Sequence, residues 1–218
     1  MEAAIEGASP DETPEGNPET STFAEVNRRD GAALQEVSGR DVAALLNPRP
    51  VVLVGVYHKG RVNFSTVAWI TPTSHDPAML AFAVRESSCT LSLLKKTRRC
   101  SINVLDANLA LPALWCGSHC GHSEDKGAQV PHTLSPLPAT AHSLPQVCGA
   151  PSVLDCQVNS LQQTGDHLLV VATVEHAYTR CARDTRGRIA ASDTLLCVQH
   201  DTFAQAKVLK GKDAAPTS

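Results

Sequence analysis

Between Val51 and Gln199 the sequence repeats short apolar runs separated by turn residues, and only one helical pattern clearly interrupts them. The runs are rich in β-branched residues and are bounded by Pro, Gly, Asn or Asp, as β-strands are. Strands are predicted at residues 51–57, 61–70, 79–84, 101–105, 152–161, 167–178 and 194–199. Many strands with few helices favour an antiparallel barrel over alternating parallel units. We therefore predict a mostly β fold with a few short helices.

Two of these strands carry information about their surroundings. In residues 152–161, Leu154, Cys156 and Val158 alternate with polar residues, the pattern of a strand with one face in water. That pattern places Asp155 on the wet face. Residues 167–178 begin apolar on both faces, so this strand is expected to be central. Cys156, like Cys197 later in the chain, is expected to pack as a small apolar side chain.

Helices are predicted at three places. Residues 39–46 form a short helix that stops before Pro48, because the residue ahead of a proline avoids the helical region. Residues 87–99 form a longer helix with Ser88 as its N-cap, and a third, short helix lies near residues 106–115. The run Lys95, Lys96, Arg98 and Arg99 falls in the last turn of the longer helix, where cations offset the helix dipole. It is interpreted as a solvated face.

The ends of the chain differ in composition from its middle. Residues 1–22 are rich in Glu, Pro, Ser, Thr and Gly and too poor in apolar groups to offset the entropy of ordering. We predict a disordered N-terminal tail at 1–22, one domain at 23–205 and a flexible C-terminal tail at 206–218. Within the domain, residues 127–151 are proline-rich and irregular, and a loop of that length is more often functional than idle.

Bulk composition excludes several classes of protein. A net charge of −3 and a pI near 6.3 give no field that attracts a polyanion, so nucleic acid is a poor candidate partner. No apolar run reaches the roughly 20 residues that span a bilayer, and the N-terminus is acidic where a signal peptide is basic. A cytoplasmic protein that binds no membrane is expected. The eight cysteines are then expected to be reduced thiols.

The start of the helix at 87–99 is a candidate anion site. A first helical turn has free N–H groups and a partial positive charge. Arg85 adds a fixed charge there, and Ser87, Ser88 and Thr90 add hydroxyls. A plain capped helix without a ligand explains the serines equally well, so this feature alone leaves both interpretations open.

The segment from Ser65 to Ala68 is a candidate surface for a planar ring. Its side chains are small, so a heterocycle with donors and acceptors on its edge can approach the backbone amides. Trp69 and Ile70 are suited to form the wall of such a pocket. Asp76 before Pro77 is ordinary turn chemistry and is given a structural role.

A rival site lies in the stretch WCGSHCGH, which holds Cys116, His119, Cys120 and His122. Thiolates and imidazoles are the usual ligands of zinc, but a structural zinc site draws two ligand pairs from separate segments, and no second pair is evident. We therefore predict no metal site. A reactive thiol at Cys120 and simple loop packing remain as alternatives.

The residues also carry a resemblance to a known family. RPVVLVGVY, STVAWITPTSHDP, the RESSCT helix start and the SINV strand end resemble, in this order, the flavin reductase-like family with the FMN-binding split-barrel fold. EDKGAQVPHTLSPLPA, APSVLDCQV and GDHLLVVATV are similar to further stretches of the same family. The resemblance runs from about Pro48 to Tyr178. No single motif is decisive, but their order and spacing are together fairly specific.

The resemblance implies an antiparallel Greek-key split β-barrel that forms a homodimer and binds FMN near the subunit interface. It implies that the flavin ring lies against residues 65–71 and the phosphate at residues 85–90. Lys126, in the family's D-K pair, and His167, in its G-D-H, are implied as a phosphate contact and a flavin or nicotinamide contact; His167 is the candidate catalytic residue. The candidate cofactor-binding residues are Ser65, Thr66, Val67, Ala68, Trp69, Thr71, Arg85, Ser87, Ser88, Thr90 and Lys126. This chain departs from the family at Ala68, Leu93 and Gly127.

The implied activity is hydride transfer from NADH or NADPH to FMN, by a flavin reductase that releases reduced flavin to a partner oxygenase or passes electrons onward. Such chemistry resides in the flavin and requires no side-chain nucleophile, in keeping with a sequence that has no nucleophile elbow. Two alternatives remain: a flavoredoxin-like electron-transfer protein, and a non-catalytic split-barrel module that binds metal or haem.

Overall fold

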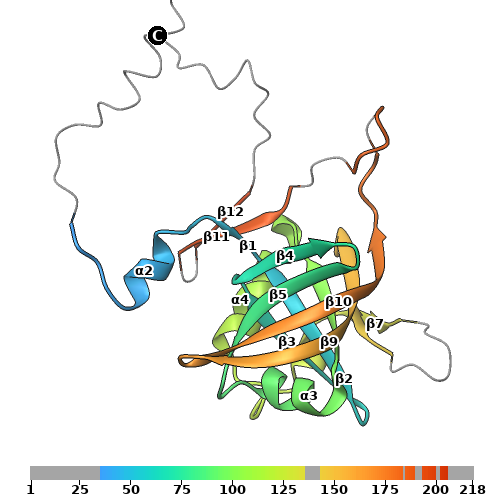
Figure 1. Cartoon of the computed structure of the whole chain (residues 1–218). Helices are drawn as coiled ribbons and strands as arrows, with labels where there is room; N and C mark the ends of the chain where they lie inside the picture. The colour runs from blue at the N-terminus through green and yellow to red at the C-terminus, as the bar shows by residue number, and fades with distance from the viewer. Residues whose placement is uncertain (1–34, 136–142, 184, 190–192, 200–201, 206–218) are drawn as a thin grey trace, which may run out of the picture. The chain divides into compact units, whose positions relative to one another are not determined.

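The structure is a computed structural model that describes residues 35–135, 143–183, 185–189, 193–199 and 202–205 (Figure 1). Residues 35–39 belong to a first unit and form no helix or strand, and all elements named below belong to a second unit that begins at Arg40. The predicted tails, 1–22 and 206–218, lie outside the described residues. The proposed domain limits therefore stay predictions.

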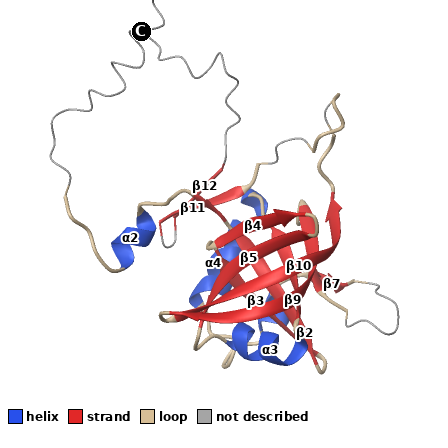
Figure 2. Ribbon diagram, in the orientation of Figure 1, coloured by secondary structure: helices blue, strands red, loops and turns tan. Residues whose placement is uncertain are grey.

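The three predicted helical regions are confirmed (Figure 2): the first two helices are shorter than predicted, and the third extends to Ser118, beyond the predicted end. They are α2 (Arg40–Ala44), α3 (Cys89–Thr97), η1 (Ala107–Leu109), α4 (Ala110–Ser118) and a further short helix, α5 (Lys126–Gln129). In the described part of the chain, none of the helices is long and apolar enough to cross a membrane.

The strands outnumber the helices, as predicted. They are β1 (Arg49–Pro50), β2 (Val52–His58), β3 (Arg61–Val67), β4 (Ile70–His75), β5 (Ala78–Arg85), β6 (Arg99–Val104), β7 (His132–Leu134), β8 (Pro145–Val147), β9 (Ser152–Thr164), β10 (His167–Thr179), β11 (Leu195–Gln199) and β12 (Thr202–Gln205). The predicted loop at 127–151 thus contains most of α5 and the hairpin of β7 and β8, and its residues 136–142 lie outside the described part.

The main sheet has the strand order β3-β2-β6-β9-β10-β5-β4, and all its ladders are antiparallel. As predicted, β10 is an interior strand. β3 and β4 lie at opposite edges of the sheet, although only Ala68 and Trp69 separate them in the chain. The Ala83 N–H donates to the Trp69 carbonyl at 2.9 Å and holds this link beside β5. The chain therefore passes from one edge of the sheet directly to the other, which curls the sheet into a barrel.

The single strand predicted at 61–70 is wrong for this reason. The alternation of apolar and polar residues stops at Ser65, but mostly strand-favouring residues continue from Thr66 to Ile70, so the sequence does not reveal where the chain changes its pairing partner. The strand ends where its pairing partner changes, and not where the local preference for strand changes. Residues 61–67 pair with β2, whereas residues 70–75 pair with β5.

The side chains on the two faces of β3 pack into two separate hydrophobic clusters. Val67 belongs to a cluster inside the barrel, whose lower end is closed by Leu91 and Leu94 of α3 (Figure 1). Val62 and Phe64 belong to a second cluster on the outer face, which also contains residues of α4 and β8. Because successive strand residues point to opposite faces, one strand links both cores.

Asp155 is not on a wet face, contrary to the sequence prediction. Its residue is 0% exposed, although Asn159 farther along β9 is exposed. The hairpin of β7 and β8 covers this part of the sheet: the Ser101 hydroxyl, opposite Asp155, donates to the Pro145 carbonyl of β8. The covering element, β8, ends at Val147, shortly before β9 begins at Ser152, and it changes the environment of Asp155 without changing the alternation of the strand.

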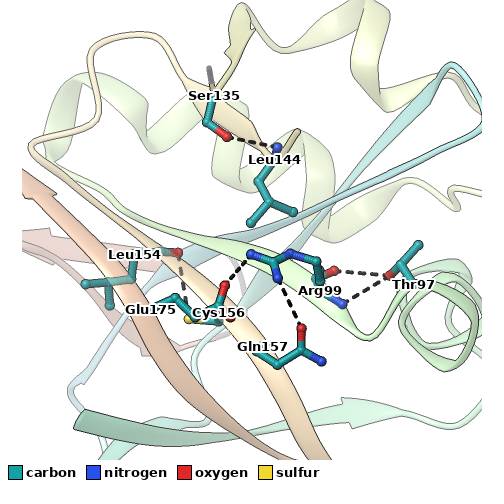
Figure 3. A network of polar contacts seen from close by, with 8 residues as sticks. All are labelled: Thr97, Arg99, Ser135, Leu144, Leu154, Cys156, Gln157 and Glu175. Carbon is teal, nitrogen blue, oxygen red and sulfur yellow. Dashed lines mark hydrogen bonds and ion pairs between the residues drawn. The ribbon is translucent and has the colours of Figure 1, made fainter. Parts of the chain in front are cut away.

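Arg99 is also misplaced by the sequence prediction. It lies in β6 and not on the solvated face of α3, and its side chain is only 14% exposed. Its guanidinium donates to Gln157 at 3.2 Å and forms an ion pair with Glu175 of β10 (Figure 3). Lys95 and Lys96 are exposed at the end of α3, as predicted.

Candidate functional site

The turn between β5 and α3 forms the expected helix start. β5 ends at Arg85, and the Ser88 N–H donates to the Arg85 carbonyl at 3.0 Å, which reverses the chain. Ser88 has extended backbone angles and accepts the Leu91 N–H at 3.1 Å, so the predicted N-cap is confirmed. Arg85 and Ser87 are exposed beside it. Their side chains are free to meet a ligand at the positive end of α3.

Thr90 lies on the inner side of the same turn. It is 0% exposed, and its hydroxyl accepts the Asn63 amide at 2.7 Å and bonds to the Ser65 hydroxyl. The structure thus brings together two predicted site residues from β3 and α3. Sequence reasoning missed Asn63, although its spacing of two from Ser65 places both on one face of the strand. The Thr90 hydroxyl holds β3 against α3 and is buried away from solvent.

The side chains of Thr66, Val67 and Ala68, in the predicted ring surface, also contact other parts of the protein. Thr66 donates to the Ala113 carbonyl of α4 at 2.5 Å, Val67 is buried in the barrel core, and Ala68 packs against the outer core. β3 is an edge strand of the main sheet. The surface that this segment offers is therefore mainly its backbone edge, followed by the exposed residues Trp69 and Thr71.

Trp69 is the centre of an aromatic and charged cluster. Its ring lies 4.8 Å from the His167 ring, centre to centre, at an interplanar angle of 31°. The Arg49 guanidinium carbon lies 5.7 Å from the Trp69 ring centre, within cation–π range. Trp69 is 42% exposed, so part of its surface is left for a ligand. The predicted contact residue His167 is thus brought to the predicted ring segment.

Asp166 links this cluster to the start of α3. Its carboxylate lies 2.7 Å from His167 Nδ1, and its carbonyl accepts the Glu86 N–H at 3.2 Å. His167 is also directly opposite Arg85 in the ladder of β5 and β10. The hydrogen bond with His167, with a smaller contribution from Arg85, lowers the pKa of Asp166 below its usual 3.8. Asp166 is therefore a carboxylate at neutral pH, positioned to orient the imidazole.

A surface hollow of about 460 Å³ adjoins these residues. It is lined by Arg40, Arg85, Glu86, Ser87 and Asp166. Two guanidinium groups and two carboxylates are present, so the hollow is not simply cationic. An anion that enters it is expected to lie toward the arginines and the N-terminus of α3, away from the carboxylates.

Lys126 does not line this hollow. It is the first residue of α5 and only 4% exposed, and its amine donates to the Cys116 carbonyl at 2.6 Å. Burial lowers its pKa, while the thiols of Cys116, Cys120 and Cys89 act in the opposite direction. A role for Lys126 at the phosphate remains a prediction.

The Cys/His motif does not assemble into a metal site. In the described part of the chain no three His, Cys, Asp or Glu side chains are grouped so as to hold a metal ion. Cys116 is buried and Cys120 exposed. The His119 ring stacks on Trp115 at 4.4 Å and 16°, and its Nδ1 lies 2.9 Å from the Trp115 carbonyl. His119 is thus engaged in loop packing, one of the alternatives considered for the motif.

Comparison with known proteins identifies the family. Residues 45–204 match the family described as flavin reductase like domain. The chain belongs to the flavin reductase-like family. The match includes β3, β4, the start of α3 and His167, so the site described above lies entirely within the family domain except for Arg40.

Three relatives of this flavin reductase-like chain illustrate the family. The chain is 27% identical over 116 residues to a flavin reductase of Pseudomonas putida, which covers 53% of this chain and 63% of that protein. An FMN-binding protein from Thermus thermophilus, solved with bound 1-cyclohex-2-enone, is 28% identical with a TM-score of 0.68 and covers 81% of this chain and 95% of its own. Flavoredoxin from Methanosarcina acetivorans is 20% identical with a TM-score of 0.72, covering 83% and 95%, and shares the fold. The predicted family and split-barrel fold are confirmed.

The residues of this family member fit the phosphate of FMN, at the start of α3, more clearly than they fit its ring, along β3. Arg85, Ser87 and the N-terminus of α3 provide a cation, a hydroxyl and free N–H groups for a phosphate. The backbone edge of β3 and the half-exposed Trp69 provide a polar edge and an aromatic wall for a planar ring. The side chains of Ser65, Thr66 and Thr90 are already hydrogen-bonded within the protein.

Proposed function

We propose that this protein is an FMN-binding oxidoreductase that transfers hydride from NADH or NADPH to flavin. The observation that supports the proposal most is that a candidate phosphate site and a candidate flavin-ring site lie next to each other. The positive end of α3, with Arg85 and Ser87, adjoins the link between β3 and β4, where Trp69 stacks with His167. FMN, when bound, supplies the hydride acceptor, so the protein needs only to bind and orient.

Each part of the site has a role in this proposal. Arg85, Ser87 and Ser88 hold the phosphate at the start of α3, and the backbone of residues 65–71 contacts the ring. Thr90 acts indirectly, because its bonds to Asn63 and Ser65 fix the distance between β3 and α3. His167, oriented by Asp166 and packed on Trp69, presents its ring to flavin or nicotinamide.

Two relatives above 25% identity support separate parts of the proposal. The FMN-binding protein of Thermus thermophilus supports FMN as the cofactor, and the flavin reductase of Pseudomonas putida supports the reductase activity. By analogy with the family, we propose a homodimer with FMN near the interface. A partner oxygenase that consumes the reduced flavin is the proposed electron acceptor.

The phosphate assignment is tested by comparing two flavins that differ only in the phosphate. Arg85→Ala is expected to weaken FMN binding by about 1.5–3 kcal/mol, or roughly 10- to 150-fold in Kd, because a charge-assisted hydrogen bond is lost. Riboflavin binding, measured in the same fluorescence titration, should change little. Lys95→Ala, which removes an exposed cation at the other end of α3, is the matched control. Equal losses for FMN and riboflavin contradict the assignment.

The reductase activity is tested with the wild-type protein saturated with FMN. Adding NADH or NADPH without oxygen should bleach the flavin absorbance. A protein that binds FMN but is bleached by neither nicotinamide is not a nicotinamide-dependent reductase and is better described as an electron-transfer flavoprotein. A protein that binds no flavin refutes both descriptions.

A further inference from the structure

Two cysteines face each other across the ladder of β6 and β9. Cys100 and Cys156 are directly opposite in this antiparallel pair, and both are 0% exposed. Both side chains belong to the cluster inside the barrel, and both thiols are free. The Cys156 thiol also lies 3.7 Å from the carbonyl of Leu154 (Figure 3). Two thiols are therefore held next to each other by strand register and not by a mobile loop.

The backbone geometry of this pair is compatible with a disulfide. Directly opposite residues of antiparallel strands have Cα atoms about 4.5 or 5.5 Å apart, and both values lie within the roughly 4.4–6.8 Å found across disulfides. Their Cβ atoms are typically about 4.5–5.5 Å apart, whereas a disulfide prefers about 3.5–4.5 Å. A bond between them needs an approach of about 1 Å at most. It is expected to be strained, and strained disulfides are more easily reduced.

We propose that Cys100 and Cys156 are a redox site in which a peroxide forms a reversible disulfide across β6 and β9. One sulfur attacks a peroxide oxygen and the O–O bond breaks, which leaves a sulfenic acid and one water. The second sulfur then attacks the sulfenic sulfur, so that the S–S bond forms and a second water leaves. In total two thiols lose two electrons and two protons, and hydrogen peroxide is reduced to two waters. A dithiol reverses the step by thiol–disulfide exchange.

The surroundings of the two cysteines determine which oxidant can reach them and how fast they are oxidised. The hydrogen bond between the two thiols, together with burial, raises the pKa of Cys100 well above its usual 9.0. Because the thiolate is the reactive form, the reaction is slow at neutral pH. Full burial favours a small neutral oxidant such as hydrogen peroxide over a bulky charged disulfide.

Peptide mapping of the full-length wild-type protein tests the proposal without any substitution. The reduced protein is treated with hydrogen peroxide, unfolded in iodoacetamide and digested. The expected product is a cross-linked peptide pair that joins Cys100 to Cys156, lighter by two hydrogens, with neither of these two cysteines alkylated. Alkylation of all eight, a link between other cysteines, or sulfinic acid at either residue without a link overturns the proposal.

Variants and a reversal step sharpen the test. Cys100→Ser and Cys156→Ala should each abolish the link, whereas Cys116→Ser, which changes a buried cysteine of the outer core, should retain it. Loss of the link in Cys116→Ser contradicts a direct pair. Dithiothreitol should restore the thiols of Cys100 and Cys156 under native conditions. A link that is reduced only after unfolding refutes its reversibility, even if the bond itself is found.

Discussion

Thr90 and Asp155 are equally buried polar side chains, yet their surroundings differ. Each residue is 0% exposed. The Thr90 hydroxyl, at the start of α3, has hydrogen bonds with both Asn63 and Ser65. Neither carboxylate oxygen of Asp155, beneath the hairpin of β7 and β8, meets the distance and angle of a hydrogen bond to a described residue, although the Gln146 side chain lies close enough to act against the rise in the pKa of Asp155 that burial causes. The Thr90 hydroxyl thus has its hydrogen bonds and the Asp155 carboxylate does not, although Asn63 Oδ1, next to Thr90, also lacks a partner among the described residues.

The difference shows what each region contributes. A buried polar group that is hydrogen-bonded costs little and fixes its neighbours, whereas an unpartnered one retains its full desolvation cost. The Thr90 region therefore stabilises the fold and fixes the geometry of the proposed FMN site. The Asp155 carboxylate is expected to cost stability, because the guanidinium of Arg99 is directed to Glu175 and Gln157 (Figure 3).

Removing the Thr90 hydroxyl should have the largest effect. Thr90→Val keeps the shape of the side chain but leaves the buried Asn63 amide without its acceptor, so the free energy of unfolding should fall by about 1–3 kcal/mol. Denaturant unfolding measures the loss. Thr90→Ser, which keeps the hydroxyl, should recover most of it, and Thr73→Val on the exposed part of β4 is the surface control. No loss in Thr90→Val contradicts the role given to this hydrogen-bond network.

Neutralising Asp155 should have a smaller effect of opposite sign. Asp155→Asn removes a buried charge with little change in shape, so the free energy of unfolding at neutral pH should rise by about 1 kcal/mol. The same denaturant experiment measures it, with the exposed Asp76→Asn as control. A destabilised Asp155→Asn protein shows that the carboxylate is engaged by a partner, and the contrast with Thr90 then fails.

The gain in Asp155→Asn should depend on pH in one direction. Burial raises the pKa of Asp155 above its usual 3.8, although Gln146, His176 and Arg99 act against this shift. Below 3.8 the carboxyl is protonated in both the folded and the unfolded protein, so wild type and variant should be equally stable. As the pH rises through the folded pKa, the wild-type protein loses stability relative to the variant. Unfolding curves from pH 3 to pH 7, roughly the range over which a carboxyl titrates, measure this difference. A constant difference contradicts titration of Asp155.

The same two regions show what could be read from the sequence. Ser88 as a helix cap and the helix after β5 follow from local chemistry, and both were predicted correctly. The burial of Asp155 depends on β8, which lies in the proline-rich segment that was predicted as an irregular loop. Alternation along β9 does not show that this segment folds over the strand, so it predicted the wrong environment. Likewise, mostly strand-favouring residues continue from Thr66 to Ile70, through the link between β3 and β4, and do not show that the chain changes edges there.

The site follows the same rule. Arg85, Ser87 and His167 were expected in one place, and strand register brings Arg85 and His167 opposite each other. The hydroxyls of Ser65 and Thr90 were predicted as ligand contacts, a role that no observation tests directly. Whether a hydroxyl on a strand faces a ligand or another element depends on what packs against that strand, and here α3 packs against Ser65. Local sequence carries no information about that partner.

Ser65→Ala should have the smallest effect and tests whether the network at α3 acts as a unit. Ser65 is only half-buried, and Thr90 keeps its bond to Asn63 in this variant, so a loss of about 0.5–1 kcal/mol is expected. In Thr90→Val the same substitution should cost less, because the partner hydroxyl is already gone. A double-mutant cycle in denaturant measures this coupling, and residues in one hydrogen-bond network are expected to deviate from additivity by about 0.5 kcal/mol or more. Strict additivity would mean that Ser65 and Thr90 do not depend on each other, and that the spacing of β3 and α3 is held by apolar packing alone.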